Sequence, residues 1–212
     1  MRIPNRMNSS KFLVPLGLLI LAGALLLPLY SQPNRASLLI LNAQIADGTG
    51  APLRKANVRI ALNHIVGIGE LQPESGEPTI DARGLVLAPG FIDIHNHSDG
   101  LQEHPLAETQ ISQGITTLIV GADGDSPWPL INWVRQQQQK PAAVNVGVLA
   151  GHATIREQVM GQDFKRLATP QEVQRMEAMV GSAMNQAALG LSSGLEYEVG
   201  SYSATDEVIA MA

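Results

Sequence analysis

The sequence predicts an α/β fold with a parallel sheet, preceded by a small β-rich unit and an N-terminal hydrophobic helix. Beyond residue 90, short apolar runs alternate with segments of helical periodicity, the pattern of successive βαβ units. Before residue 89, short β-branched runs alternate with turn residues, and the first 32 residues are basic and then apolar. We therefore divide the chain into residues 1–32, 36–89 and 90–212.

The composition limits the possible partners and ligands. The 212 residues carry a formal net charge of −5 without a basic block, so we expect no nucleic-acid partner. The chain has no cysteine, which excludes disulfides and thiolate zinc ligands within it. Any metal must therefore be held by His, Asp or Glu.

Residues 1–32 have the pattern of a signal peptide or signal anchor. Arg2, Arg6 and Lys11 precede Phe12–Leu29, which carries no charge and is long enough, at ~1.5 Å per residue, to cross a hydrocarbon core. No Ala-x-Ala cleavage site follows, which favours an uncleaved transmembrane helix over a cleaved signal. The rest of the chain is then expected outside the cytoplasmic membrane, either membrane-anchored or free in the periplasm or another extracytoplasmic space.

Residues 36–89 are predicted to form a compact β unit. Turn residues separate the expected strands and include Asp47–Gly50 and Asp81–Gly84. His64 falls at a predicted turn, and we interpret it as a structural or exposed residue. The strands are expected at residues 37–41, 57–61, 64–68 and 85–88.

Residues 90–212 are predicted to hold four βα units. The helix after Thr169 has the best local signature, because Thr169 can cap it, Pro170 suits its first position and Glu172 completes a capping box. Its apolar stripe, which we assign to the core, comprises Val173, Met176, Val180, Ala183, Met184 and Ala187. Further helices are expected at 105–112 and 129–139 and from Thr205. The first strand is expected to end at His95 and His97. The next three strands are expected to cover residues 115–120, 143–149 and 189–193.

Two histidines stand one residue apart at the end of the first of these strands, in Ala88-Pro89-Gly90-Phe91-Ile92-Asp93-Ile94-His95-Asn96-His97-Ser98-Asp99. Side chains of a strand alternate between its faces, so His95 and His97 project to the same side. Two neutral imidazoles at a strand end can hold a divalent metal such as zinc. Asp93 lies on the same face, and Asp99 follows closely.

Residues Leu85–Asp99 resemble the first barrel strand of the amidohydrolase superfamily, whose His-x-His pair binds metal. Three later blocks, residues 114–121, 151–156 and 190–197, resemble in order those of the D-aminoacylase (N-acyl-D-amino-acid deacylase) branch. The resemblance runs from about Ser37 to the last residue. It implies the N-terminal part of a metal-dependent (β/α)₈ TIM barrel, preceded by a small β-sandwich segment.

A closed barrel of this kind needs eight βα units and about 250 residues. We therefore expect this chain to be the N-terminal portion of a longer enzyme, and a half-barrel that dimerises is the alternative. The resemblance places the remaining metal-binding histidines, and a catalytic Asp that acts as general base, in the second half.

The resemblance also implies roles for polar residues after the strands, where parallel barrels build their active sites. His95 and His97 are expected to bind metal. The D-aminoacylases have a metal-binding Cys where this chain has Asp123, and either Asp123 or Glu196 could replace it. We favour Glu196 as the bridging ligand and give Asp123 a catalytic role in orienting substrate or a histidine. Tyr197 is expected to polarise the scissile carbonyl.

His152 begins another of the matching blocks. It is expected to contact substrate or, alternatively, to fix the loop together with Arg156.

The predicted function is metal-dependent hydrolysis of C–N bonds, most simply of a small N-acyl-D-amino acid or peptide-like amide. One or two Zn²⁺ ions would activate water and polarise the carbonyl. A cyclic-amide hydrolase of the dihydroorotase or hydantoinase kind is the nearest alternative. A non-catalytic binding module, built as a membrane-anchored half-barrel, is the alternative that is not an enzyme.

Overall fold

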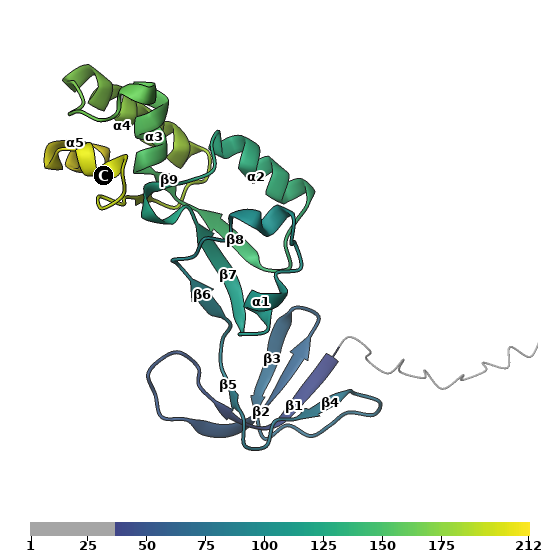
Figure 1. Cartoon of the computed structure of the whole chain (residues 1–212). Coiled ribbons are helices and arrows are strands. Elements are labelled where there is room, and N and C mark those ends of the chain that lie inside the picture. The colour runs from purple at the N-terminus through teal and green to yellow at the C-terminus, as the bar shows by residue number, and fades with distance from the viewer. Residues whose placement is uncertain (1–36) are drawn as a thin grey trace, which may run out of the picture. The chain divides into compact units, whose positions relative to one another are not determined.

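Residues 37–212 are described by a computed structural model, so the predicted hydrophobic helix at residues 12–29 lies outside them (Figure 1). They form two compact units. The first contains residues 37–45 together with Leu53–Val86, and the second contains Ala46–Pro52 together with Leu87–Ala212. The predicted domain ranges, 36–89 and 90–212, stay predictions.

The first unit is built on one five-stranded sheet. Its order is β3-β2-β1-β4, and β5 also pairs with β1. β1 and β2, and β2 and β3, are antiparallel, whereas β1 and β4 are parallel. The strands are β1 (Ser37–Ile45), β2 (Arg54–Ala61), β3 (His64–Gly69), β4 (Thr79–Asp81) and β5 (Val86–Leu87). The predicted sandwich segment is a single sheet in this part of the chain, and the short β4 was not expected.

Strand β1 contains an irregularity at Asn42. Asn42 adopts a left-handed φ of 61°, and the register with β2 shifts between Ile40 and Ala43. Asn tolerates this conformation better than most residues. Leu39 and Ala43, on either side of the irregularity, are both fully buried.

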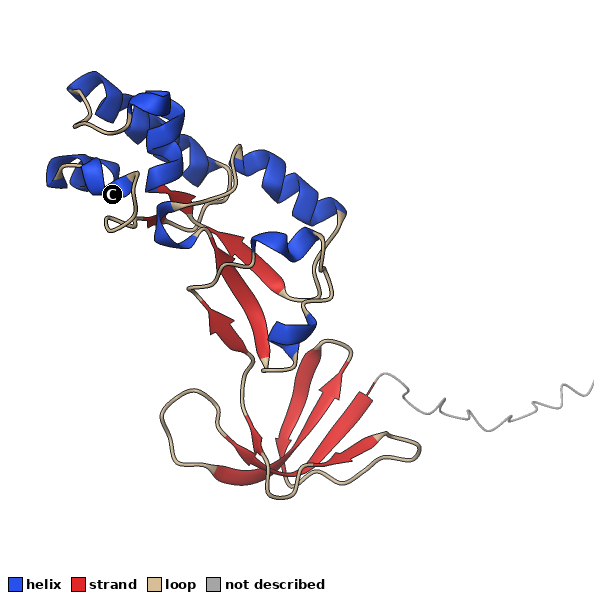
Figure 2. Cartoon of the chain, viewed as in Figure 1, coloured by secondary structure: helices blue, strands red, loops and turns tan. Residues whose placement is uncertain are grey.

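The second unit contains parallel strands that follow one another in chain order (Figure 2). β6 (Phe91–Asp93), β7 (Ile115–Val120) and β8 (Asn145–Val148) form one parallel sheet. β9 (Ala150–Gly151) pairs in parallel with β10 (Leu191–Ser192). Only Leu149 separates β8 from β9, so they continue one predicted strand. The expected parallel α/β arrangement is confirmed.

Helices and short 3-10 turns connect these strands. The α-helices are α1 (Glu108–Ile111), α2 (Leu130–Gln139), α3 (His152–Met160), α4 (Pro170–Asn185) and α5 (Thr205–Met211). The 3-10 turns are η1 (Asp99–Gln102), η2 (Ala122–Gly124), η3 (Gly161–Asp163) and η4 (Gly200–Tyr202). No helix in residues 37–212 combines the length and the apolar character needed to span a membrane.

Helix α4 follows its sequence signature closely. The Thr169 hydroxyl accepts a hydrogen bond from the Glu172 amide at 3.3 Å, and the Glu172 carboxylate accepts one from the Thr169 amide at 2.8 Å. This is the predicted capping box, with Pro170 in the first turn. Met176, Val180 and Ala183 of the predicted stripe are buried. Met184 is 45% exposed and Ala187 is also exposed, so the assignment of these two residues to the core was wrong.

Two helical segments differ from the prediction. Helix α3 was missed, because its buried side includes polar residues that interrupt the apolar pattern: His152, Thr154 and Arg156. The helix expected over 105–112 is reduced to α1. Ala107 has a left-handed φ of 45°, which prevents a continuous helix from Pro105.

The main core of the second unit lies between its strand ends and helices. Val120 and Val148, from neighbouring strands, pack in one cluster with Ile155 of α3 and Met176 of α4. Leu130 of α2 is fully buried in the same cluster. The core is largely aliphatic, with Phe164 inside it and Trp128 and Trp133 packed against it. It holds the C-terminal ends of the strands, which carry the polar residues described next.

Candidate metal centre

His95 and His97 lie in the loop that leaves β6. The Asp93 carboxylate accepts a hydrogen bond from the His95 amide at 3.1 Å. The Asn96 side-chain amide donates to the carbonyls of Asp93 and Ile119 at 3.1 and 3.2 Å. The residue between the histidines therefore ties their loop to both β6 and β7. Both imidazoles remain about two-thirds exposed, with side-chain accessibilities of 64% and 65%.

Asp123 lies in η2, directly after β7. Its φ is +57°, and Gly121 and Gly124 on either side have φ values of +85° and +82°. Asp is one of the few residues besides glycine that adopts this conformation readily. A Cβ atom on Gly121 would lie 2.7 Å from the Leu149 carbonyl oxygen, so this position requires glycine. The left-handed turn brings the Asp123 carboxylate back towards the end of β6.

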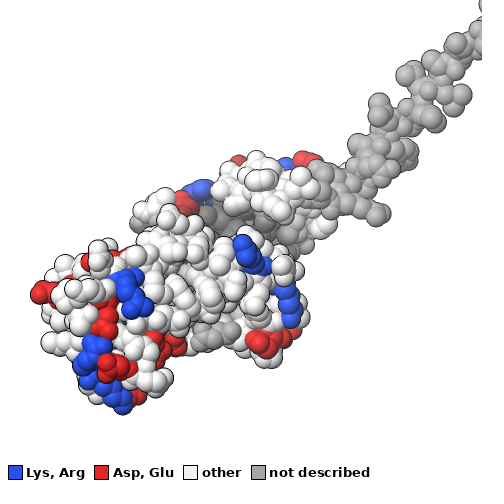
Figure 3. Space-filling view, turned by 90° about the horizontal axis from the view of Figure 1, so that it is seen from above, with Lys and Arg blue, Asp and Glu red and all other residues white. Residues whose placement is uncertain are grey.

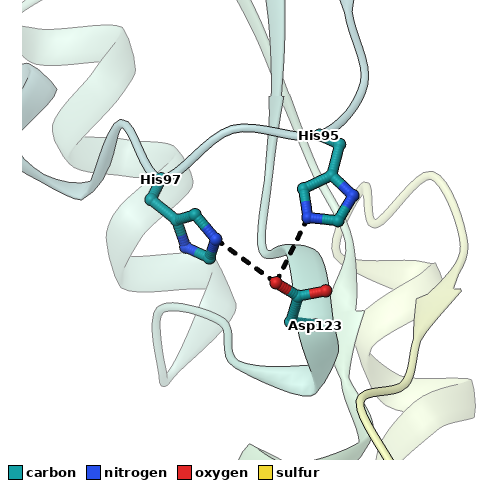
Figure 4. A group of neighbouring side chains, drawn as sticks. All are labelled: His95, His97 and Asp123. Atoms are coloured by element: carbon teal, nitrogen blue, oxygen red, sulfur yellow. Dashed lines mark hydrogen bonds and ion pairs between the residues drawn. The ribbon is translucent and has the colours of Figure 1, made fainter.

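The three side chains converge on one point (Figure 4). Asp123 Oδ2 lies 3.2 Å from His95 Nε2 and 3.3 Å from His97 Nε2. One ligand atom from each residue falls within 4.8 Å of the others. Two imidazoles and a carboxylate are a donor set that zinc accepts in proteins. The group therefore fits the predicted metal.

The pKa of Asp123 lies below its usual value. Partial burial acts to raise it, but the hydrogen bond and charge of His95, the Tyr197 hydroxyl and the charge of His97 lower it by more. The carboxyl group is therefore ionised at neutral pH, as a metal ligand must be.

Tyr197 reaches the same carboxylate from the loop after β10. Its hydroxyl donates to Asp123 Oδ2 at 3.3 Å. The negative charge of Asp123 raises the pKa of Tyr197. The phenol therefore stays protonated at neutral pH and keeps a hydrogen to donate.

Glu196 is not part of this group. Its side chain is exposed, and among residues 37–212 the potential metal ligands that converge are His95, His97 and Asp123. The geometry therefore favours Asp123 as the carboxylate beside the two histidines, and the ligand role of Glu196 stays a prediction. Sequence spacing could not decide between Asp123 and Glu196, because both carboxylates follow predicted strands. The left-handed turn of η2, which directs Asp123 towards the histidines, is not visible in the spacing.

A pocket of about 510 Å³ adjoins the group. Its lining includes His97 and Tyr197 and four carboxylates, and it includes no Lys or Arg. One of these carboxylates, Glu198, forms an ion pair with Lys165. The lining residues are His97, Asp123, Asp125, Ala153, Thr154, Glu157, Tyr197, Glu198 and Val199.

The profile of the amidohydrolase family matches residues 78–208. This chain belongs to the amidohydrolase family. N-acyl-D-aspartate deacylase of Alcaligenes xylosoxydans xylosoxydans is 39% identical over 201 residues, which are 84% of this chain and 40% of that protein. D-aminoacylase of the same organism is 32% identical over 203 residues, 84% of this chain and 41% of the relative.

A solved structure matches this amidohydrolase over a similar extent. The N-acyl-D-glutamate deacylase of Bordetella bronchiseptica, complexed with zinc and a phosphonate inhibitor that mimics the tetrahedral intermediate, superposes with a TM-score of 0.76 at 32% identity. The match covers 84% of this chain and 42% of that one. The chain thus spans about two-fifths of the length of these relatives, and it is related to the N-acyl-D-amino-acid deacylases.

His152 of this amidohydrolase is separate from the metal group and fully buried. Its Nε2 lies 2.9 Å from Glu207 Oε1, and its Nδ1 lies 3.3 Å from the Ser193 hydroxyl. Arg156 forms an ion pair with the other oxygen of Glu207. This arrangement matches the alternative in which His152 and Arg156 fix the loop. That His152 contacts substrate stays a prediction, and the complete burial of its side chain does not support it.

Glu207 was missed as a partner of these residues. It lies in the first turn of α5 and is only 3% exposed. The sequence did contain one indication of a buried ion pair. Arg156 stands among apolar residues, and an arginine that is buried needs a carboxylate partner. The separation of 51 residues leaves the identity of that carboxylate open until the fold is known.

Proposed function

We propose that this chain provides the metal-binding part of a zinc-dependent hydrolase that cleaves the amide bond of small N-acyl-D-amino acids. The observation that carries the proposal is the convergence of His95, His97 and Asp123 after two adjacent parallel strands. The names of the relatives, which describe deacylases of N-acyl-D-amino acids, support the substrate class.

The parallel strands β6 to β10 are proposed to be the first part of a (β/α)₈ barrel. Their chain-order arrangement, and the polar residues at their C-terminal ends, support this. The activity is proposed for the protein that carries this unit, with the general base supplied by an Asp after the last barrel strand.

Each residue of the group has a distinct role in the proposed chemistry. His95, His97 and Asp123 would hold one Zn²⁺, and a second ion would need further ligands. When bound, zinc lowers the pKa of a water molecule and polarises a carbonyl oxygen. The Tyr197 hydroxyl, which is kept protonated, would donate a hydrogen bond to the oxygen that gains negative charge when the carbonyl is attacked. The adjoining pocket would take the rest of the substrate.

The test compares His97→Ala with His104→Ala in the native protein purified from cells. His104 is an exposed histidine of the same unit that lies outside the three-residue group, which makes it a matched control. We expect the wild type and H104A to carry zinc and to release the amino acid from N-acetyl-D-methionine, and H97A to lose both. Equal zinc content and equal activity in H97A would refute the proposal. A wild-type protein without zinc would favour the binding module instead.

We also propose that residues 1–32 direct the protein through the cytoplasmic membrane and anchor it there. The support is the basic stretch ahead of the uncharged run Phe12–Leu29. Fractionation of cells tests this. Recovery of the protein with the membranes, accessible to protease from outside, is the expected result, and recovery in the cytoplasmic fraction would contradict it.

A further inference from the structure

The hydroxyl of Ser192, at the end of β10, connects the two ends of the turn that carries Asp123. Ser192 Oγ accepts a hydrogen bond from the Gly124 amide at 3.1 Å and donates one to the Gly121 carbonyl at 2.5 Å. One side chain thus joins backbone groups on both sides of Asp123. Ser192 and the turn are 71 and 68 residues apart in sequence, so this contact exists only in the folded chain.

The turn needs such a contact because of its backbone conformation. Gly121, Asp123 and Gly124 all have positive φ. For a residue with a Cβ atom this region is less stable than the right-handed or extended regions, so the surrounding structure must hold Asp123 there. The two histidines that face Asp123 are themselves exposed and add little restraint to it.

The backbone that follows Ser192 packs closely against the turn that carries Asp123. A Cβ atom on Gly194 would lie 2.1 Å from the Asp123 carbonyl oxygen, so the chain after β10 runs directly against the turn. Parallel pairing of Ser192 with Gly151 fixes the serine from the other side. Its hydroxyl is therefore presented to the turn by a fixed strand.

We propose that Ser192 is the positioning residue that holds Asp123 in the conformation in which its carboxylate meets His95 and His97. The inference rests on the proposed function, because it assigns Ser192 to the support of the proposed metal site. Without the hydroxyl, the Gly121 carbonyl and the Gly124 amide lose this shared partner, and the turn gains alternative conformations. Loss of residues that orient metal ligands typically weakens metal binding by about 10- to 100-fold. We expect a loss in this range for Ser192→Ala.

The experiment measures metal affinity in the 212-residue chain, purified without a histidine tag in mild detergent. The variants are Ser192→Ala, Ser192→Thr and Ser182→Ala, and the control Ser182 is an exposed serine on α4. Cobalt titration followed by absorbance reports the ligand field, calorimetry reports zinc affinity, and urea unfolding of the metal-free chain reports stability. We expect S192A to bind about 10- to 100-fold more weakly, and S192T, which keeps the hydroxyl, and S182A to bind like the wild type.

The outcomes separate the two proposals. If the wild type binds neither cobalt nor zinc, the proposed metal site itself is wrong. If the wild type binds and a folded S192A binds equally well, only the role of Ser192 is wrong. A lower unfolding midpoint of S192A with unchanged metal affinity would likewise reduce Ser192 to a structural residue and overturn the inference.

A measurement on the wild type keeps the inference testable if S192A does not fold. The hydrogen bond from the Gly124 amide to Ser192 predicts slow exchange of this amide hydrogen with solvent, which NMR can follow. Rapid, unprotected exchange at Gly124 would overturn the inference.

Discussion

Among residues 37–212, Asp123 is the acid whose carboxylate meets both exposed histidines. An imidazole pair alone offers two neutral donors, and the carboxylate adds the third donor and a negative charge. We predict that Asp123→Asn weakens zinc binding by more than about tenfold, because the amide keeps the shape of the side chain but loses its charge. Calorimetric titration of the purified chain with zinc measures this effect.

The matched control is Glu196→Gln, the same charge removal at the carboxylate that the sequence favoured. Glu196 lies outside the group of three, so its variant should bind zinc like the wild type. The opposite ranking, with E196Q weak and D123N normal, would restore Glu196 as the ligand and contradict the site described above.

At the scale of secondary-structure elements, the ion pair between Arg156 of α3 and Glu207 of α5 joins two helices inside the core. Both side chains are inaccessible, at 0% and 2% exposure. Removing one partner of such a pair leaves the other charge buried without compensation. We predict that Glu207→Gln lowers the free energy of unfolding by about 3 kcal/mol. Urea unfolding followed by the fluorescence of Trp128 and Trp133, which pack against this core, measures the change.

The exposed pair Lys165–Glu198 provides the comparison. Its side chains are 57% and 64% exposed, and pairs of this kind contribute about 0–1 kcal/mol. Lys165→Met should therefore leave the unfolding curve almost unchanged. If Glu207→Gln and Lys165→Met lowered the free energy of unfolding equally, burial would not determine how much these ion pairs contribute to stability.

The first unit has its own electrostatic link, between Arg59 of β2 and Glu77. Two hydrogen bonds of 2.8 and 2.9 Å join the guanidinium to both carboxylate oxygens. They lower the pKa of Glu77 from 4.5 to about 2. Because the pKa is depressed on folding, the stabilisation is fully present above about pH 4.5 and is lost as the pH falls towards 2.

We predict that wild type and Glu77→Gln respond differently to acid in this unit. The amides of β1 and β2 in the wild type should lose protection against hydrogen exchange between about pH 5 and 2, after correction for intrinsic rates. In E77Q their protection should be lower at pH 7 and should change less over the same interval. Parallel pH profiles in the two proteins would contradict the assignment of this acid sensitivity to Glu77.

The elements that sequence analysis predicted well are those with local determinants. The strand at 115–120 and helix α4 matched, because a run of β-branched residues and a capping box act within a few residues of chain. Helix α3 was missed because its Arg156 is neutralised by a residue 51 positions away. The sequence could not place Asp123, rather than the favoured Glu196, beside the two histidines for a similar reason, since a left-handed turn that contacts another strand sets the position of Asp123.

At the scale of the whole molecule, charges of opposite sign lie close together at the places where charged side chains gather on the face shown in Figure 3. Arg166, for example, forms ion pairs with both Asp163 and Glu172. The pocket beside His95, His97 and Asp123 differs, because its lining holds four carboxylates and no Lys or Arg. An acidic substrate side chain placed there would meet charges of its own sign.

We therefore predict that the native protein prefers N-acyl-D-amino acids with neutral side chains over those with acidic ones. The specificity constant kcat/KM should be higher for N-acetyl-D-methionine than for N-acetyl-D-aspartate, and the ratio should fall as salt screens the charges. Faster turnover of the aspartate derivative, as the name of the 39% identical relative suggests for that protein, would show that the pocket is not where the side chain binds.

The donor set of the metal group has a consequence for the surroundings in which the protein can work. Its donors are two imidazoles and a carboxylate, and the whole chain contains no cysteine. Thiolate ligands are lost when peroxide or disulfide exchange oxidises the sulfur, whereas these nitrogen and oxygen donors do not take part in that chemistry. Metal binding at this site should therefore be equally durable in oxidising and reducing media.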